Sequence, residues 1–499
     1  MDNLAKKLEE FKEYNRKIEY LNSASSVLYW DMRVGIPSKG VAYRGEVLAF
    51  LSGETYKLQT SSTMEEYIKY FEGKNLDTIN TSMVQRAKKN YNLTKKIPEK
   101  RYIEYVELTS NSEIAWQEAK EKSDFSIFKP YLEKIVDFNR EFINYWGYEV
   151  NKYDTLLDFY EPGITVEKLD KVFTELRSAI VVLLEKIKKS SVSPRTDYFN
   201  ENFSKVSQES FSKYILEKMG FDFEKGRLDE SVHPFTIEFS NKDVRITTNY
   251  HEDDFRSALF GTIHEGGHAI YEQAIDDNLK GTLLGSGASM GIHESQSRFY
   301  ENIIGRSKEF WTYFYIEAQK RFPQFKGVTL EEFYKGINHV EPSLVRIEAD
   351  ELTYSLHIII RYEIEKALIN GEIEVTDLPR IWGEKYKEYL GVEPKNDSEG
   401  VLQDTHWAGG SFGYFPSYAL GNLYGAQFLN KMLKDIPDSF ERIANGDLKF
   451  LQAWLKDNIH NYGAVYKPSE IIKKVTGEEL TAKYFIEYLN KKYSEIYNI

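Results

Sequence analysis

The chain has 499 residues, of which 41% are hydrophobic and 29% are charged, and this balance indicates a large globular protein with ample core. Acidic residues (78) outnumber basic ones (65), which gives a formal net charge of −13. An acidic chain without basic runs argues against a nucleic-acid partner. The chain has no cysteine, which excludes disulfides and thiolate ligands and leaves nitrogen and oxygen as metal ligands.

The sequence gives no sign of a membrane or export segment. Residues 1–22 predict an amphipathic helix without the apolar core of a signal peptide. The longest aliphatic run, Ile180 to Leu184, is far too short to cross a bilayer. We therefore expect a cytoplasmic protein without a membrane partner.

Helical spacing dominates the N-terminal part of the chain. Residues 1–22 and 64–150 are rich in Lys, Glu, Tyr and Leu and contain few glycines. Between them, Leu28 to Pro37 interrupts the pattern and predicts an ordered loop. Apolar positions from Leu169 to Ile187 mark one face of a long helix, and the serine-containing residues 188–196 resemble a linker.

The hydrophobic period changes at Pro234. Residues 235–239 and 244–248 alternate apolar and polar around Ser240-Asn241-Lys242, which predicts a β-hairpin. The hairpin directly precedes a helix that we expect to begin near Asp253. An exposed edge strand could hold an extended peptide by backbone pairing. A small sheet that only braces the helix is the other interpretation.

The helix after the hairpin carries an H-E-x-x-H motif. His264 and His268 are four residues apart, so both imidazoles lie on one helix face and can bind one metal ion. Glu265 lies one step round the helix, where a general base would reach the attacking water. We choose Glu294 as the third ligand, because a His2Glu set leaves one position open for water. Two surface histidines beside an exposed glutamate are the alternative.

Glycines cluster around these residues. Gly281 to Gly291 holds four glycines and predicts a compact loop before the third ligand. Gly409 to Tyr424 mixes glycine with aromatic residues, and the residues from there to the end are expected to be helical. Adjacent Gly266 and Gly267 cost roughly 1 kcal/mol each inside a helix, which indicates close approach of a neighbouring backbone.

Six motifs occur in a fixed order between residues 233 and 407. They are His233-Pro234-Phe235, Asp243 to Thr247, His264 to His268, His293 to Gln296, Val345 to Asp350, and Gly400 to Trp407. In this order they resemble the thermostable carboxypeptidases of the Taq type, which are related by fold to oligopeptidases and angiotensin-converting enzyme. Weaker similarities at Trp30-Asp31 and Glu161 to Gly163 extend the match over most of the chain.

The resemblance implies a mainly α, two-lobed helical metallopeptidase with a deep cleft and a small β-hairpin or sheet beside the H-E-x-x-H helix. We expect residues 1–499 to form a single catalytic domain. Its N-terminal helices would cover the cleft, and residues 233–424 would hold the active-site motifs. The resemblance also implies a homodimer with one divalent metal ion per chain. Zinc is the default for a His2Glu set, with cobalt or manganese as substitutes.

The expected reaction is the release of C-terminal amino acids from peptides with a free C-terminus, by metal-activated water and with Glu265 as general base. Such an enzyme needs a cation for the substrate carboxylate, and a guanidinium binds a carboxylate bidentately. Arg245 and Arg346 lie in family motifs, so the resemblance implies that one or both bind substrate. Structural ion pairs with Asp243 and Asp350 are the alternative.

The oxyanion of the reaction also needs hydrogen-bond donors. In the related oligopeptidases a His and a Tyr on a glycine-rich loop supply them, which suggests His406 and Tyr418 here, with Tyr414 second. His293 is expected to contact substrate or to support a metal ligand, with an ordinary packed histidine as the alternative. With 36 tyrosines in the chain, ordinary packing is the alternative for either tyrosine.

Three other functions would use part of the same pattern. An oligoendopeptidase would share the metal site without needing an arginine for the carboxylate. A non-catalytic peptide-binding relative conflicts with the intact Glu265, because loss of the base would disable chemistry while sparing metal binding. A di-iron helical bundle would use Glu265 and His268 as one ligand pair, and we find no convincing second pair.

Overall fold

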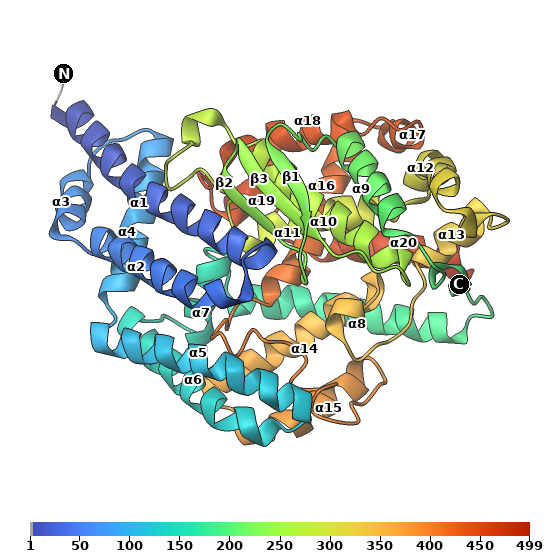
Figure 1. Ribbon diagram of the computed structural model, residues 1–499, viewed down its shortest axis with the longest axis horizontal. Coiled ribbons are helices and arrows are strands. Elements are labelled where there is room, and N and C mark those ends of the chain that lie inside the picture. Colours follow the sequence, from blue (N-terminus) through green and yellow to red (C-terminus); the bar gives the residue numbers. More distant parts are fainter. Residues whose placement is uncertain (1–2) are drawn as a thin grey trace.

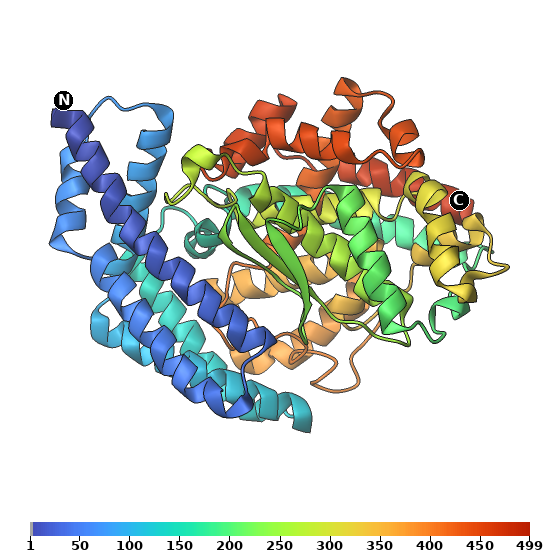
Figure 2. The ribbon, with the colours of Figure 1, turned by 45° about the horizontal axis from the view of Figure 1, so that its top comes forward.

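The computed structural model describes residues 3–499, which are mostly helical (Figure 1). Six N-terminal helices form a layer along one side of the molecule, seen in blue and cyan in Figures 1 and 2. Their bounds are α1 Asn3–Val34, α2 Val41–Gln59, α3 Ser62–Phe71, α4 Thr78–Lys95, α5 Glu99–Lys122 and α6 Phe125–Trp146. The mainly α fold expected from the sequence is confirmed.

The predicted loop from Leu28 to Pro37 is wrong over most of its length. Helix α1 continues through Val34, and only the next few residues leave the helix. Trp30 is buried and its ring meets Phe235 of the hairpin at a centroid distance of 5.5 Å. This long-range packing stabilises the last helical turns, and the local sequence pattern contains no trace of it.

The later helices surround a small sheet. Helix α8 Val166–Lys189 confirms the predicted long amphipathic helix. The other helices between α6 and residue 370 are α7 Lys152–Tyr160, α9 Lys205–Met219, α10 Phe255–Gln273, α11 Met290–Arg298, α12 Lys308–Arg321, α13 Leu330–Ile337 and α14 Glu351–Asn370. Those that follow are α15 Leu378–Tyr389, α16 Pro416–Asp435, α17 Ser439–Ala444, α18 Lys449–Asn458, α19 Pro468–Thr476 and α20 Lys483–Tyr497. Among residues 3–499, no helix is long and apolar enough to cross a membrane.

The sheet has three strands in the order β1-β3-β2, and it lies over helix α10 (Figure 1). The predicted hairpin is confirmed as β2 Thr236–Ser240 and β3 Asp243–Thr248, which pair antiparallel. The sequence did not predict β1 Gly226–Glu230, which pairs parallel to β3, because its polar residues lack an alternating pattern. Strand β2 is therefore an edge strand.

The two faces of the hairpin have different surroundings. Thr236 pairs with Ile246 and Glu238 with Val244, and side chains of paired residues share a face. Val244 and Ile246 are fully buried, and both hairpin strands pack on α10. Thr236 and Glu238 therefore face the α10 side, whereas Arg245 belongs to the opposite face, toward α1.

Candidate active site

Helix α10, on which strands β2 and β3 pack, carries the H-E-x-x-H motif. Its N-terminus is capped by Asp254, whose carboxylate accepts a hydrogen bond from the Arg256 backbone, a standard N-cap contact. The helical repeat then places the rings of His264 and His268 beside each other, with centroids 4.9 Å apart. Both imidazoles are largely buried, as expected for side chains directed at a common point.

Glycines let three helices meet at this point. A Cβ atom on Gly267 would lie 2.6 Å from the Gln296 carbonyl oxygen on α11, and one on Gly421 of α16 would lie 2.4 Å from Glu294 Cγ. No side chain fits at such distances. The backbone approach indicated by the Gly-Gly pair is therefore present, and α11 lies between α10 and α16.

Glu294 on α11 completes a group that we call the ligand cluster: His264, His268 and Glu294. Glu294 Oε2 lies 3.8 Å from His264 Nε2 and 3.5 Å from His268 Nε2. One ligand atom from each residue lies within 4.8 Å of the others. Two imidazole nitrogens and a carboxylate oxygen at this spacing are a suitable donor set for a divalent metal ion.

A second layer of charges surrounds the ligand cluster. Arg298 Nε donates to Glu294 Oε1 at 2.7 Å, and Glu301 Oε2 lies 2.8 Å from His264 Nδ1. Burial opposes the charge on Glu294, but Arg298 and His264 outweigh it and hold the pKa of Glu294 well below its ordinary value. The carboxylate is therefore ionised and available as a ligand. No motif in the sequence predicted a role for Arg298 and Glu301, although both lie on Glu294's helix face at spacings of four and seven.

His293 supports His268 from behind. Its Nδ1 lies 2.6 Å from His268 Nδ1, and its Nε2 lies 2.8 Å from Glu272 Oε1. Burial lowers the pKa of His268 to about 3, which leaves its ring neutral, the form that binds metals. Of the roles that the sequence left open for His293, which include ordinary packing, the geometry favours support of a metal ligand over contact with substrate.

Glu265 lies next to the cluster and contacts the sheet. Thr236 Oγ1 on β2 donates to Glu265 Oε2 at 2.6 Å, so the edge strand fixes the carboxylate. Burial raises the pKa of Glu265, although His264 opposes the shift. The carboxylate is consequently a stronger base than an exposed glutamate.

A second group, which we call the loop cluster, consists of His406, Tyr414 and Tyr418. His406 Nε2 lies 3.3 Å from the Tyr418 hydroxyl, and the two tyrosine rings have centroids 5.1 Å apart. Burial lowers the pKa of His406 to about 3, so the ring is neutral and carries one N–H donor. The structure thus brings together the three residues that the resemblance had suggested as oxyanion donors and substrate contacts.

Arg346 joins the two clusters. Its guanidinium donates to both oxygens of Asp404, at 3.2 and 2.8 Å, and to the Tyr354 hydroxyl at 3.1 Å. The Tyr354 ring in turn lies under Arg298, 4.2 Å from its guanidinium carbon. Arg346 also lies over the Tyr418 ring at 5.0 Å. The sequence offered an ion pair between Arg346 and Asp350 as the alternative role. In the structure Arg346 forms its ion pair with Asp404 instead.

Arg245 is placed elsewhere. It forms a bidentate pair with Asp243 at 2.8 Å for both contacts and lies over the Phe239 ring at 4.7 Å. These contacts are on the sheet face that turns toward α1 and away from Glu265. The sequence predicted the same role for both arginines. In the structure Arg346 lies between the two clusters, and Arg245 lies on the far face of the sheet.

Glu365 on α14 holds the loop from beneath. Its carboxylate accepts hydrogen bonds from Trp407 Nε1 at 2.8 Å, the Gly413 backbone at 2.9 Å and the Tyr153 hydroxyl at 2.7 Å. Trp407 and Gly413 lie at the two ends of the turn between His406 and Tyr414. The carboxylate is fully buried, so this residue fixes the loop cluster without belonging to it.

Comparisons with known proteins cover nearly the whole chain. The family model described as carboxypeptidase Taq (M32) metallopeptidase matches residues 10–493. Carboxypeptidase 1 of Bacillus subtilis is 51% identical over 491 residues, or 98% of each chain. Thermostable carboxypeptidase 1 of Thermus thermophilus is 39% identical over 97% of this chain and 98% of its own. The structure of an M32 carboxypeptidase from Deinococcus radiodurans R1 has a TM-score of 0.96 at 34% identity, covering 99% of this chain and 100% of its own.

Proposed function

Because this chain belongs to the carboxypeptidase Taq (M32) family of metallopeptidases and is a metallocarboxypeptidase, we propose that the ligand cluster holds its metal ion. The convergence of one atom from each of His264, His268 and Glu294 is the observation that supports this assignment. A divalent ion bound there would act as a Lewis acid and lower the pKa of water. Zinc is the proposed metal, with cobalt or manganese as substitutes.

Glu265 is the proposed general base. Its carboxylate is fixed by Thr236 and its pKa is raised mainly by burial, so it can take a proton from the attacking water and deliver it to the leaving amine. An attacking water and a positioned carboxylate suffice for peptide hydrolysis without an acyl-enzyme. A general base of this kind contributes about 10² to 10⁴ in rate.

His406 and Tyr418 are the proposed donors to the oxyanion. The neutral His406 ring and the Tyr418 hydroxyl lie 3.3 Å apart, so both could donate to one oxygen atom of a bound peptide. Tyr414 packs on Tyr418 and is the proposed third contact with substrate. Buried, pre-oriented donors of this kind need no reorganisation as charge develops.

Arg346 is the proposed partner of the substrate's terminal carboxylate. It lies between the two clusters, and Asp404 and Tyr354 hold its guanidinium plane. Arg245 has less support, because its guanidinium is bidentate with Asp243 on the far face of the sheet. For His293 we propose orientation of His268 rather than contact with substrate.

Domain organisation is part of the proposal. Residues 1–499 would form one catalytic domain in which the N-terminal helices cover the cleft and residues 233–424 hold the active-site residues. Support comes from α1, which packs on β2 and lines a cavity with it. Limited proteolysis would test this, since a single domain should release no stable N-terminal fragment.

We also propose a homodimer. Helix α2 buries none of its residues, and it exposes Tyr43 and Phe50 to 72% and 66%, which is unusual for aromatic side chains. Light scattering would give twice the chain mass of 58.3 kDa if the proposal holds. A cytoplasmic location is proposed on the cysteine-free composition, and cell fractionation would test it.

One experiment tests the catalytic proposal directly. The metal-loaded protein is incubated with a free-acid peptide and with its C-terminal amide twin, and mass spectrometry follows the products, with Glu265→Gln as control. We expect a ladder of single-residue losses from the free acid only, and none with the variant. Internal cuts in both peptides would instead identify an oligoendopeptidase, and no cleavage with any metal would favour a peptide-binding protein.

A further inference from the structure

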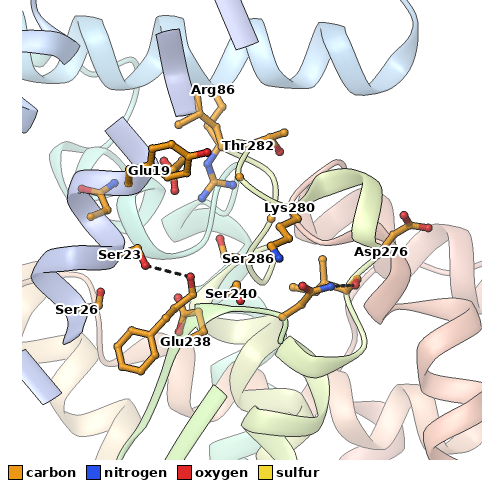
Figure 3. A pocket seen from close by; sticks show the side chains of 18 of the residues that line it. Glu19, Ser23, Ser26, Arg86, Glu238, Ser240, Asp276, Lys280, Thr282 and Ser286 are labelled. Carbon is orange, nitrogen blue, oxygen red and sulfur yellow. Dashed lines mark hydrogen bonds between the residues drawn. The ribbon is translucent and has the colours of Figure 1, made fainter. Parts of the chain in front are cut away.

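A cavity of about 420 Å³ lies between the N-terminal helices and the edge of the sheet (Figure 3). Its walls come from α1, α4, strand β2 and residues 275–286. We call it the β2 cavity. Its volume lies within the range of small-molecule sites, roughly 300–1,000 Å³.

Strand β2 connects this cavity to the reaction centre. Thr236, which bonds to Glu265, and Glu238, which lines the cavity, are two residues apart on the same face of the strand. Alternate residues of a strand are about 6.6 Å apart. The cavity therefore begins about two residues of extended chain away from the catalytic carboxylate.

The loop opposite β2 makes a second connection. Ser286 lines the cavity, and the next residue, Gly287, donates its backbone N–H to Glu272 Oε1 at 2.8 Å. Glu272 holds His293, the support of a metal ligand. Both walls of the cavity thus lead to residues beside the ligand cluster, Glu265 and His293.

Most charges in the cavity are balanced in pairs. Glu19 and Arg86 are both half-buried and their charges interact, and Figure 3 shows both side chains at the same end of the cavity. Asp276 and Lys280 add one charge of each sign near the outside, where Lys280 is exposed. These four residues leave no net charge.

Glu238 carries the remaining carboxyl group of the cavity. Over residues 3–499, no Lys or Arg nitrogen lies within salt-bridge distance of its carboxylate. Burial raises the pKa of Glu238 to about 7. The neighbouring carboxylate of Glu272 adds to this shift, and the imidazole of His293, which is already bonded to Glu272, opposes it. A half-buried carboxylate without a cation is costly, and a bound cation would offset that cost.

The direction in which a bound peptide must run also leads to the β2 cavity. A carboxypeptidase leaves one residue beyond the scissile bond, so the rest of the peptide must extend to the other side. Around Arg346 the space is closed by buried Tyr354 and Asp404, whereas the β2 cavity offers room along an edge strand that can pair with a peptide. Residues before the scissile bond would enter the cavity.

We propose that the β2 cavity is a subsite for a positively charged group of the substrate, located two residues before the scissile bond and bound by Glu238. The group is an ammonium ion. It comes either from the N-terminus of a tripeptide or from a lysine side chain in a longer peptide. This inference rests on the proposed function and adds a substrate preference to it.

Two pairs of peptides distinguish the sources of the ammonium group. Ala-Ala-Phe is compared with acetyl-Ala-Ala-Phe, and acetyl-Lys-Ala-Phe with acetyl-norleucine-Ala-Phe, by kcat/KM for release of phenylalanine. We expect the charged member of at least one pair to be favoured about tenfold, mainly through KM. The first pair reports on the N-terminus and the second on the side chain.

Glu238→Gln is the test variant, and the readout is the ratio within each pair. We expect the ratio to fall to about one. Glu224→Gln removes a charge from an exposed residue outside the cavity lining and should keep the wild-type ratio. Ratios near one in the wild type, or a preference that survives Glu238→Gln, would overturn the subsite. If none of the four peptides is cleaved, the proposed function fails, and the subsite fails with it.

Discussion

The ligand cluster and the loop cluster differ in how their side chains are held in place. His264, His268 and Glu294 lie on two regular helices, and the residues that support them come mostly from the same two helices or directly follow them. His406 and Tyr418 flank an irregular turn whose position depends on Glu365, more than forty residues earlier in the chain. One cluster is positioned by local geometry and the other by distant contacts.

This difference suggests a division of labour. A metal site, the role proposed for the ligand cluster, needs its ligand atoms at fixed separations, and the helical repeat supplies them. Donors to an oxyanion must match a substrate that is absent until binding, and a loop allows their position to be set separately from the metal. Variants in the first cluster should therefore change metal content, whereas variants in the second should change kcat at constant metal content.

Glu294→Gln should give the largest effect. The substitution keeps the side-chain volume but removes the ligand charge and the partner of Arg298. We expect loss of bound metal and a fall in activity on the order of a thousandfold. Elemental analysis after dialysis, together with kcat on a free-acid peptide, measures both. Full metal content in this variant would contradict the assigned ligand.

Tyr418→Phe should lower kcat by about a hundredfold, because one of the two proposed donors to the oxyanion is lost. Metal content should remain that of the wild type, which sets this variant apart from Glu294→Gln. Tyr424→Phe offers a matched control, since the Tyr424 hydroxyl bonds to Glu161 away from the loop cluster. Equal losses in the two tyrosine variants would show that the effect is structural.

His293→Ala should weaken metal binding by roughly 10- to 100-fold, because His268 loses the group that orients it. We expect activity to recover when the metal concentration is raised. Titration of the metal-free protein, followed by calorimetry, gives the affinity. A variant that binds metal normally and loses only affinity for peptide would return His293 to the role of substrate contact.

Glu365→Gln should give the smallest change, about a tenfold lower kcat, because the loop loses part of its fixed position. An amide cannot accept hydrogen bonds at its nitrogen, so one or more of the three donors is left without a partner. Metal content and KM should change little. Glu363→Gln on the same helix is the control, because Glu363 pairs with Arg177 outside the loop.

The sequence was sufficient wherever a short-range pattern determined the structure. The alternation of residues 235–248 predicted the hairpin, and the spacing of His264 and His268 predicted a shared helix face. The choice of Glu294 as third ligand was also possible from the sequence. The structure brings its carboxylate to the two histidines, although only a measured metal content tests the role itself.

Long-range contacts set the rest. No local pattern marks Glu365 as the residue beneath the loop, because its partners are Trp407, Gly413 and Tyr153. The same reason explains the continuation of α1 past Leu28, where Trp30 packs on a hairpin two hundred residues away. Arg245 and Arg346 looked equivalent in the sequence. The sequence does not show which face of its strand is covered by the helix, so it does not show on which side Arg245 lies.

The contact at Gly267 restricts which residue the H-E-x-x-H motif can hold at that position. The carbonyl oxygen of Gln296 occupies the place where a Cβ atom would stand, so the second variable position of H-E-x-x-H accepts hydrogen alone in this backbone. Contact between main-chain atoms thus limits how closely the two ligand helices approach, while the pair of Glu272 on α10 and His293 on α11 holds them together. Ions of different size must then be accommodated by side-chain torsions of the ligands, since the helices have no closer position to adopt.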